Sequence, residues 1–245
     1  MVRVDVYLPK NIHSSKCSLL LLNDGQDLPK MNFAEMIDQL HSSHHISPLC
    51  CVGVYAGDRM EEYGTSGIHD YKGRGAKASL YQRFLVEELL PFLHFSFGIE
   101  NFKTKAIAGF SLGGLSAMDT AWNFAGVFSV AGVFSGSFWW RTKDLEEGYN
   151  EDTDRIMHQK IRTGKYHPGL RFYFTTGSLD ETADRNKNGV IDSIDDTLGL
   201  IEELKKKGYS DHDISYINYE DGKHDVETWG KAMPKFLLWA FALNK

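Results

Sequence analysis

The sequence predicts an α/β fold with a mostly parallel central sheet and helices on both faces. Three observations support this: seven apolar, β-prone runs recur along the chain, segments with helical periodicity separate most of them, and the middle runs are apolar throughout. Alternating strands and helices favour a parallel sheet, because each crossover between parallel strands needs a connection as long as a helix. Strands that are apolar at every position are typical of a sheet covered on both faces.

The predicted elements follow one another along the whole chain. Strands are expected at residues 2–8, 17–22, 50–55, 105–110, 127–134, 171–176 and 214–219. Helices are expected at about residues 33–42, 77–94, 112–123, 152–162, 196–207 and 228–242. Because no internal repeat, low-complexity tract or linker interrupts them, we expect a single domain over residues 1–245.

Composition and charge exclude several classes of protein. The 245 residues are 42% hydrophobic and 24% charged, as in ordinary globular proteins. A net charge of −6 provides no basic surface, so we expect neither nucleic acid nor a membrane as a partner. No apolar run approaches the roughly 18 residues of a membrane-spanning helix. The cysteines are expected to be buried free thiols, since their number is odd and two are adjacent: Cys17, Cys50 and Cys51.

The strongest chemical signal is a serine between two glycines in AIAGFSLGGLSAM, residues 106–118. Gly109, Ser111 and Gly113 form the GxSxG pattern between an apolar run and a helical segment, the context of a nucleophile on a strand-to-helix turn. Because that turn is strained, it needs small residues on both sides of the serine. The helix that follows directs unpaired N–H groups, including that of Leu112, at the space above the hydroxyl. An incidental serine in a glycine-rich turn is the alternative.

His224 is the candidate general base, because a serine hydroxyl needs a base to accept its proton. It lies in EDGKHDVETWG, residues 220–230, in a polar loop between the last predicted strand and the last helix. The chain order serine, acid, histidine is that of the α/β-hydrolases. His69 lies in another polar loop and could line the cleft. Three further histidines have metal-like spacing but are expected to be solvated at a helix end: His41, His44 and His45.

The acid that orients the histidine is expected after the strand at 171–176, in FYFTTGSLDETADRN. Asp180 comes first after the Gly-Ser turn and lies nearest the carboxyl end of the strand, where catalytic groups collect in such sheets. Glu181 is the alternative acid, and Asp184 also lies in this loop. Each of these carboxylates could instead be a solvated loop residue.

These segments together resemble the esterase family of α/β-hydrolases that includes feruloyl and acetyl esterases, siderophore esterases, S-formylglutathione hydrolase and mycolyltransferases. The resemblance covers nearly the whole chain and implies an α/β-hydrolase fold. It rests on LLLLNDGQDL, VGVYAGDRMEEYG, RFLVEELLPFL, AGFSLGGLSAM, TGSLDE and GKHDVETW. One departure from the family pattern makes S-formylglutathione a less favoured candidate substrate, because the loop NDGQDL lacks the cysteine-containing sequence of the S-formylglutathione hydrolases.

The resemblance also assigns residues around the nucleophile. The residue after an Asp-Gly pair supplies an oxyanion donor in this family, which implies the N–H of Gln26. Arg59 matches an arginine near the cleft of relatives; it could bind a substrate oxygen or pair with Glu61 or Glu62. Trp139 and Trp140 would contact an aromatic acyl group or a sugar face, with one of the two expected in the core.

A twelve-residue segment, DRNKNGVIDSID at 184–195, matches an EF-hand calcium loop. Its expected ligands are Asp184, Asn186, Asn188, Val190 through its carbonyl, Asp192 and Asp195. The last position carries aspartate in place of glutamate, as in dockerin-type loops, so calcium affinity could fall or magnesium could compete. Because no helix precedes the segment, we expect a structural ion near the acid loop and not a sensor. A polar turn that caps the following helix is the alternative.

The expected function is that of a serine carboxylic-ester hydrolase that acts through an acyl-enzyme on acyl esters of carbohydrates or related small molecules. The alternatives are an acyltransferase on the same scaffold and a non-catalytic, calcium-stabilised binding module. We expect a structural calcium ion, no organic cofactor and a small-molecule or glycan ester as the binding partner. The absence of a signal peptide favours the cytoplasm, whereas a weak calcium loop fits an extracytoplasmic protein whose natural chain begins earlier.

Overall fold

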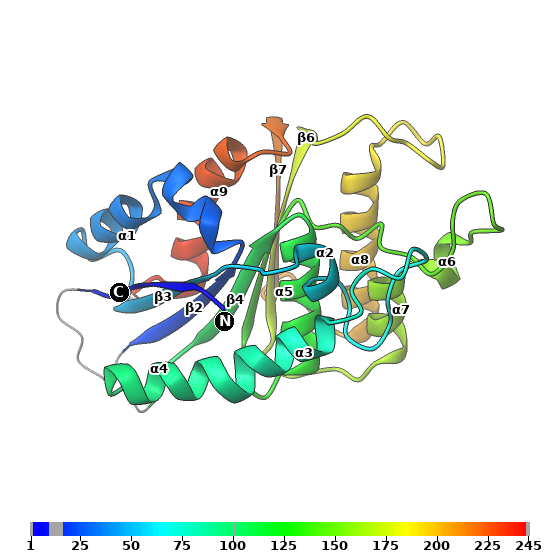
Figure 1. Cartoon of the computed structure of the whole chain (residues 1–245). Coiled ribbons are helices and arrows are strands. Elements are labelled where there is room, and N and C mark those ends of the chain that lie inside the picture. The colour runs from blue at the N-terminus through cyan, green and yellow to red at the C-terminus, as the bar shows by residue number, and fades with distance from the viewer. Residues whose placement is uncertain (1, 10–16, 100, 244–245) are drawn as a thin grey trace.

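The computed structural model describes residues 2–9, 17–99 and 101–243 and has one seven-stranded sheet at its centre (Figure 1). The strand order is β1-β3-β2-β4-β5-β6-β7, and β1 alone pairs antiparallel with its neighbour. The strands are β1 (Val4–Tyr7), β2 (Ser18–Asn23), β3 (Leu49–Val54), β4 (Lys105–Phe110), β5 (Val130–Phe134), β6 (Arg171–Leu179) and β7 (Ile214–Lys223). This is the mostly parallel sheet expected from the sequence.

Every predicted helix is present in the described residues. The longer helices are α1 (Phe33–Ser42), α4 (Leu90–Phe97), α5 (Leu112–Asn123), α7 (Ile156–Thr163), α8 (Asp192–Lys207) and α9 (Val226–Phe241). The shorter ones are η2 (Gly25–Met31), α2 (Arg59–Glu62), α3 (Ala78–Arg83), η3 (Phe84–Leu89) and α6 (Glu151–Asp154). The sequence does not predict η2 and α2, because one or two turns are too short to show a hydrophobic period. Helix α8 begins at Asp192 and not at residue 196, so the last positions of the predicted calcium loop form its first turn.

The central strands separate two apolar layers. Side chains alternate along β2, so Leu19 and Leu21 join one buried cluster while Leu20 and Leu22 join the other. Helices α3, α5, α7 and α8 cover the first face, and α1 and α9 cover the second (Figure 1). The strands β2, β3 and β5 are buried at every residue, which explains their continuous apolar sequences.

The three cysteines lie in these layers as free, fully buried thiols, which confirms the prediction. Burial raises the pKa of Cys50 to about 12, so its thiol stays protonated and unreactive at neutral pH. Among the residues described, no helix has the length and apolar character to cross a membrane.

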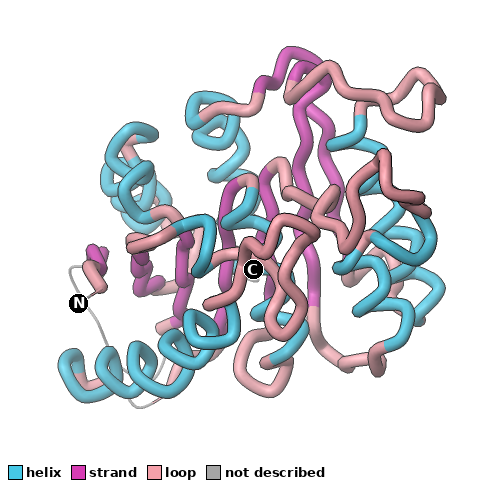
Figure 2. Tube along the Cα trace, turned by 45° about the vertical axis from the view of Figure 1, so that its right-hand side comes forward, coloured by secondary structure: helices cyan, strands magenta, loops and turns pink. Residues whose placement is uncertain are grey.

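The carboxyl ends of the parallel strands meet at one edge of the sheet. Three candidate catalytic residues each come directly after a strand: Ser111 follows β4, Asp180 follows β6 and His224 follows β7. Strands β6 and β7 extend side by side to this edge, and the loops after them lead away on opposite sides, toward α8 and α9 (Figures 1 and 2). Parallel strand order therefore collects at one place residues that are far apart in the sequence.

Candidate active site

Ser111 lies on a sharp turn between β4 and α5. Its φ of 54° and ψ of −122° are strained for a residue with a side chain. A Cβ atom on Gly109 would lie 2.3 Å from the carbonyl oxygen of Gly113, and one on Gly113 would lie 2.6 Å from Oδ2 of Asp24. The two glycines of the GxSxG pattern are therefore sterically required, since backbone or a buried carboxylate occupies the space that any side chain would need.

Asp180 holds a completely buried carboxylate beside the nucleophile turn. It accepts hydrogen bonds from the N–H of Gly177 at 3.0 Å, the hydroxyl of Ser135 at 3.1 Å and the hydroxyl of Ser193 at 3.2 Å. Its Oδ1 lies 3.9 Å from Nδ1 of His224, which is close to but beyond hydrogen-bond distance. The carboxylate is thus held by neutral donors and faces the imidazole.

The imidazole of His224 packs edge-on against Trp229, with ring centroids 5.2 Å apart. Nε1 of Trp229 in turn donates to the hydroxyl of Ser135 at 3.1 Å, and this hydroxyl donates to Asp180. The tryptophan that packs against His224 is therefore linked to the carboxylate of Asp180 through Ser135. Burial lowers the pKa of His224, while the negative charge of Asp180 opposes this shift. The lowered pKa favours the neutral ring at pH 7, the form that can accept a proton.

One pocket of about 250 Å³ contains all three residues. The hydroxyl oxygens of Ser111 and Ser137 lie 3.3 Å apart in it. Its lining is small and polar and consists of Ser111, Ser135, Gly136, Ser137, Trp139, Asp180, Glu181, Ser193 and His224. Sequence reasoning missed Ser135, Ser137 and Ser193, although the first two directly follow β5 and could have been found by the same strand-end rule.

Both predicted oxyanion donors lie in the first turn of a helix, where backbone N–H groups have no partner within the helix. Gln26 is the second residue of η2, and Leu112 is the first residue of α5. The two segments are tied together, because the side-chain amide of Asn23 donates to the carbonyl of Gly113 at 2.8 Å. The preceding Asp24 adopts a left-handed conformation with φ of 60° and is buried.

Arg59 pairs with the buried Asp24 and not with either neighbouring glutamate that the sequence offered as a partner. Its Nε and Nη2 each donate to the carboxylate at 2.9 Å, and Nη2 also reaches the carbonyl of Phe110 at 3.3 Å. Glu62 instead accepts from the N–H of Gly57 at 2.9 Å. Arg59 therefore connects the loop before Gln26 with the strand end before Ser111.

A family model described as "Putative esterase" matches residues 1–240. The chain belongs to this esterase family. Two proteins of Bacillus subtilis strain 168 are similar along nearly all of it: YbbA, 20% identical over 99% of this chain and 94% of its own length, and YjcH, 25% identical over 91% and 85%. Membership of the family identifies the chain as a carboxylic ester hydrolase, an enzyme.

Solved structures show the same α/β-hydrolase fold. The enterobactin esterase of Shigella flexneri superposes with a TM-score of 0.72 at 20% identity, over 97% of this chain and 54% of that one. The siderophore hydrolase EstB of Aspergillus nidulans gives 0.68 at 16% identity, over 96% and 88%. A ferulic acid esterase gives 0.69 at 16% identity, over 98% and 97%. The chain thus spans about half the length of the bacterial enterobactin esterase.

The two tryptophans of this esterase-family chain have different environments. Trp139 lines the pocket that contains Ser111, Asp180 and His224. Trp140 is fully buried and packs closely against Gly64 and Gly75, where added Cβ atoms would lie 3.0 and 3.3 Å from its ring. The substrate contact predicted for Trp140 is therefore wrong, because its ring fills the core. Trp140 is thus the member of the pair that the sequence analysis expected to find in the core.

The segment 184–195 forms a tight loop at the end of the molecule that carries the strand ends (Figure 1). The side-chain amides of Asn186 and Asn188 both donate to the carboxylate of Asp195, at 2.9 and 3.1 Å. The carboxylate of Asp184 accepts from the N–H groups of Asn188 and Gly189.

Not every expected ligand of this loop points inward. Asp192 faces Arg185, whose backbone N–H donates to it at 2.9 Å. Across the described part of the chain, no three His, Cys, Asp or Glu side chains are grouped as a metal site. The predicted calcium loop is not confirmed, although four of its oxygen-bearing side chains converge.

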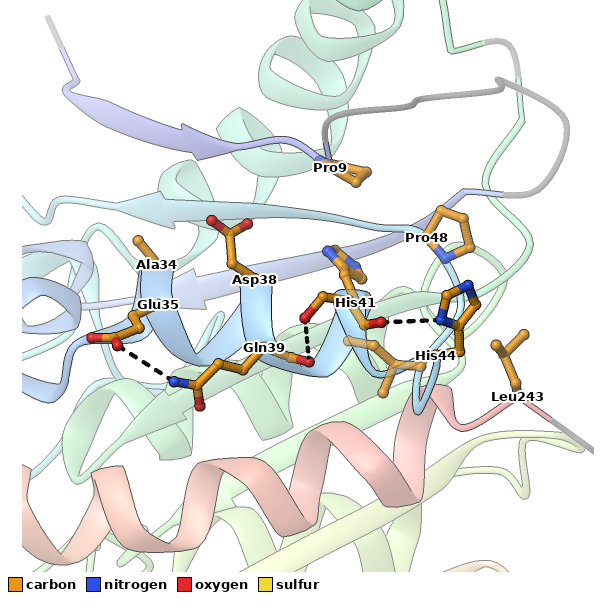
Figure 3. Close-up of a pocket in the computed structure, with 11 residues that line it drawn as sticks. Pro9, Ala34, Glu35, Asp38, Gln39, His41, His44, Pro48 and Leu243 are labelled. Atoms are coloured by element: carbon orange, nitrogen blue, oxygen red, sulfur yellow. Dashed lines mark hydrogen bonds between the residues drawn. The ribbon is translucent and has the colours of Figure 1, made fainter.

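A larger pocket, of about 830 Å³, lies away from the catalytic residues, between α1 and the turn that precedes β3 (Figure 3). His41 and His44 line it but do not form a metal site: Nε2 of His41 accepts from the N–H of Leu49 at 3.2 Å, and Nδ1 of His44 lies 3.1 Å from the carbonyl of Ser42. None of the candidate catalytic residues lines this pocket.

Replacing Arg59 by methionine should destabilise the protein, because Asp24 would remain as a buried carboxylate without its cation. We expect a loss of roughly 3 kcal/mol in the free energy of unfolding, measured by urea denaturation. The matched control is Arg83→Met, since Arg83 pairs with Glu87 on an exposed helix face and its loss should cost under about 1 kcal/mol. Equal effects of the two substitutions would contradict a structural role for the Arg59 pair.

Proposed function

We propose that this chain hydrolyses carboxylic esters through an acyl-enzyme formed on Ser111. The supporting observation is that Ser111, Asp180 and His224 each follow the end of a parallel strand and line the same pocket. His224 takes the proton of the serine hydroxyl as the oxygen attacks the ester carbonyl, and returns it to the leaving alcohol. Water, activated by the same histidine, then releases the acid and regenerates the serine.

The backbone groups around the serine stabilise the charge that develops in each step. The N–H groups of Gln26 and Leu112 act as the oxyanion hole, because each lies in the first turn of a helix, where N–H groups have no partner within the helix, and Asn23 ties the two segments together. Asp180 holds the imidazole in orientation and stabilises its protonated form. Its separation of 3.9 Å from His224 shortens when the ring becomes charged.

The substrate we propose is an acyl ester of a carbohydrate or a related small, polar molecule. The pocket of about 250 Å³ has several hydroxyl groups and Trp139 as its one large aromatic side chain, a combination that suits a polar ring lying on an aromatic face. Arg59 keeps about a third of its side chain exposed and contacts a substrate oxygen from the edge of the site. Solved relatives named for enterobactin and ferulic acid support an ester of a small molecule.

Replacing Ser111 by alanine tests the nucleophile. We expect p-nitrophenyl acetate hydrolysis to fall by roughly a thousandfold or more, and covalent labelling by a fluorophosphonate to disappear. Ser116→Ala is the matched control, because Ser116 is a buried serine in the same helix α5 outside the pocket. Labelling that persists in Ser111→Ala would show that another residue is the nucleophile, whereas no hydrolysis by the unmodified protein would favour a binding module.

The pH profile tests His224 as the base. Because the neutral ring is active, kcat/KM falls as pH drops through its pKa, and burial places that pKa below its ordinary value of 6.5. We expect the acid limb below pH 6.5. Asp180→Asn should move it lower still, because the charge that raises the pKa is lost, and should reduce kcat by roughly 10⁴-fold. Asp221→Asn, an exposed control on β7, should change neither; a midpoint above 6.5 would contradict the assignment.

We also propose that the loop at 184–195 binds a structural calcium ion. The supporting features are the EF-hand spacing and the convergence of Asp184, Asn186, Asn188 and Asp195. To bind the ion, each amide would turn its oxygen toward it and give up the hydrogen bond that this oxygen accepts from the N–H of Asn188 or Val190. Val190 would contribute its carbonyl, and Asp192, already paired with Arg185, would contribute at most through water. The ion would order the loop and take no part in the chemistry.

Calcium binding is tested by the melting temperature measured with a chelator and with added calcium, together with calorimetric titration. We expect calcium to raise the melting temperature and Asp195→Asn to abolish the increase, because a ligand that binds only the folded state stabilises it. Asp211→Asn is the control, since that exposed carboxylate lies outside the loop. A melting temperature that does not respond to calcium, with no heat of binding, would exclude the ion.

A further inference from the structure

We infer that Ser193 is a positioning residue for the catalytic acid and links the loop at 184–195 to the active site; the inference rests on the proposed role of Asp180. Ser193 is the second residue of helix α8, lies within the segment 184–195 and is almost completely buried. Its hydroxyl donates to Oδ2 of Asp180 at 3.2 Å and lines the catalytic pocket.

The charge of Asp180 depends on neutral donors to an unusual degree. Other fully buried carboxylates of the described residues have a cation beside them: Asp24 pairs with Arg59, Asp119 with Lys160 and Asp196 with Arg155. No Lys or Arg of the described residues lies within 4.0 Å of Asp180, and the imidazole of His224, 3.9 Å away, is neutral at pH 7. Each hydroxyl donor therefore contributes a large part of the stabilisation of this carboxylate, because a buried charge must be compensated.

The three donors come from different parts of the chain. Gly177 belongs to β6 and precedes Asp180 itself, and Ser135 follows β5, so the sheet holds both. Ser193 alone is supplied by α8. The start of α8 thus donates a hydrogen bond to the buried carboxylate that follows β6, at a helix end whose partial positive charge favours a nearby negative charge.

The loop sets where Ser193 lies. The N–H of Asp192 donates to the carbonyl of Ala183 at 2.8 Å, so the first residue of α8 is joined back to the beginning of the loop. Arg185 is nearly buried and pairs with Glu151, Asp192 and Asp196. A change in the loop therefore moves the first turn of α8, and with it the Ser193 hydroxyl whose hydrogen bond Asp180 accepts.

The test compares kcat and KM for p-nitrophenyl acetate in three variants. Ser193→Ala should lower kcat by about tenfold, the scale of one hydrogen bond to a charged group, with little change in KM. Ser193→Thr keeps the hydroxyl and should restore most of the activity. Thr120→Val, which removes a buried hydroxyl in α5 that donates only to the carbonyl of Ser116, should leave kcat unchanged. Melting temperatures of all variants identify any that fail to fold.

Two outcomes would overturn the inference: equal kcat in Ser193→Ala and the unmodified chain, or equal losses in Ser193→Ala and Thr120→Val. A fluorophosphonate adduct on Ser111 in these same proteins shows that the proposed function stands even when the inference fails. The link to the loop is tested by Asp184→Ala, which removes the acceptor of two loop N–H groups. Asp184→Ala should lower kcat in the unmodified chain but have no further effect in a protein that already carries Ser193→Ala. If the losses in kcat from the two substitutions instead multiply in the double variant, the loop does not act through Ser193.

Discussion

The architecture of this site depends on the close packing of α5 against the end of β4. Two glycines let the helix backbone approach so closely that no side chain fits at either position, and the turn between them forces Ser111 into a left-handed conformation. The cost of that strain is compensated by burial of nearly the whole of α5 between the sheet and its neighbours. The hydroxyl of Ser111, the proposed nucleophile, lines the pocket at the start of this buried helix.

Buried carboxylates organise the rest of the site around this turn. Asp24, with its arginine, joins the loop before Gln26 to the strand end before Ser111, and Asp180 collects hydroxyl donors from β5 and α8. A buried charge is costly when one partner is lost, so each of these groups restricts the elements that supply its partners. The same interactions that stabilise the fold therefore keep the catalytic groups in place.

The loop at 184–195 is attached to this network and is not an isolated appendage. Its backbone returns to Ala183, and Arg185 fastens it to α6 and α8 through three carboxylates. Most of this attachment needs no ion. Calcium, in our proposal, would order the outer part of the loop, whereas the inner part is already joined to the protein by charge pairs.

Much of this organisation was predictable from local sequence. The apolar runs predict the strands because period and composition are local properties, and the GxSxG glycines predict the turn because steric limits act between near neighbours. The partners of Arg59, the burial of Trp140 and the contact of Ser193 with Asp180 were not predictable, since each depends on segments far apart in the chain. Which polar groups meet at one edge of the sheet follows from strand order, and strand order is a property of the folded chain alone.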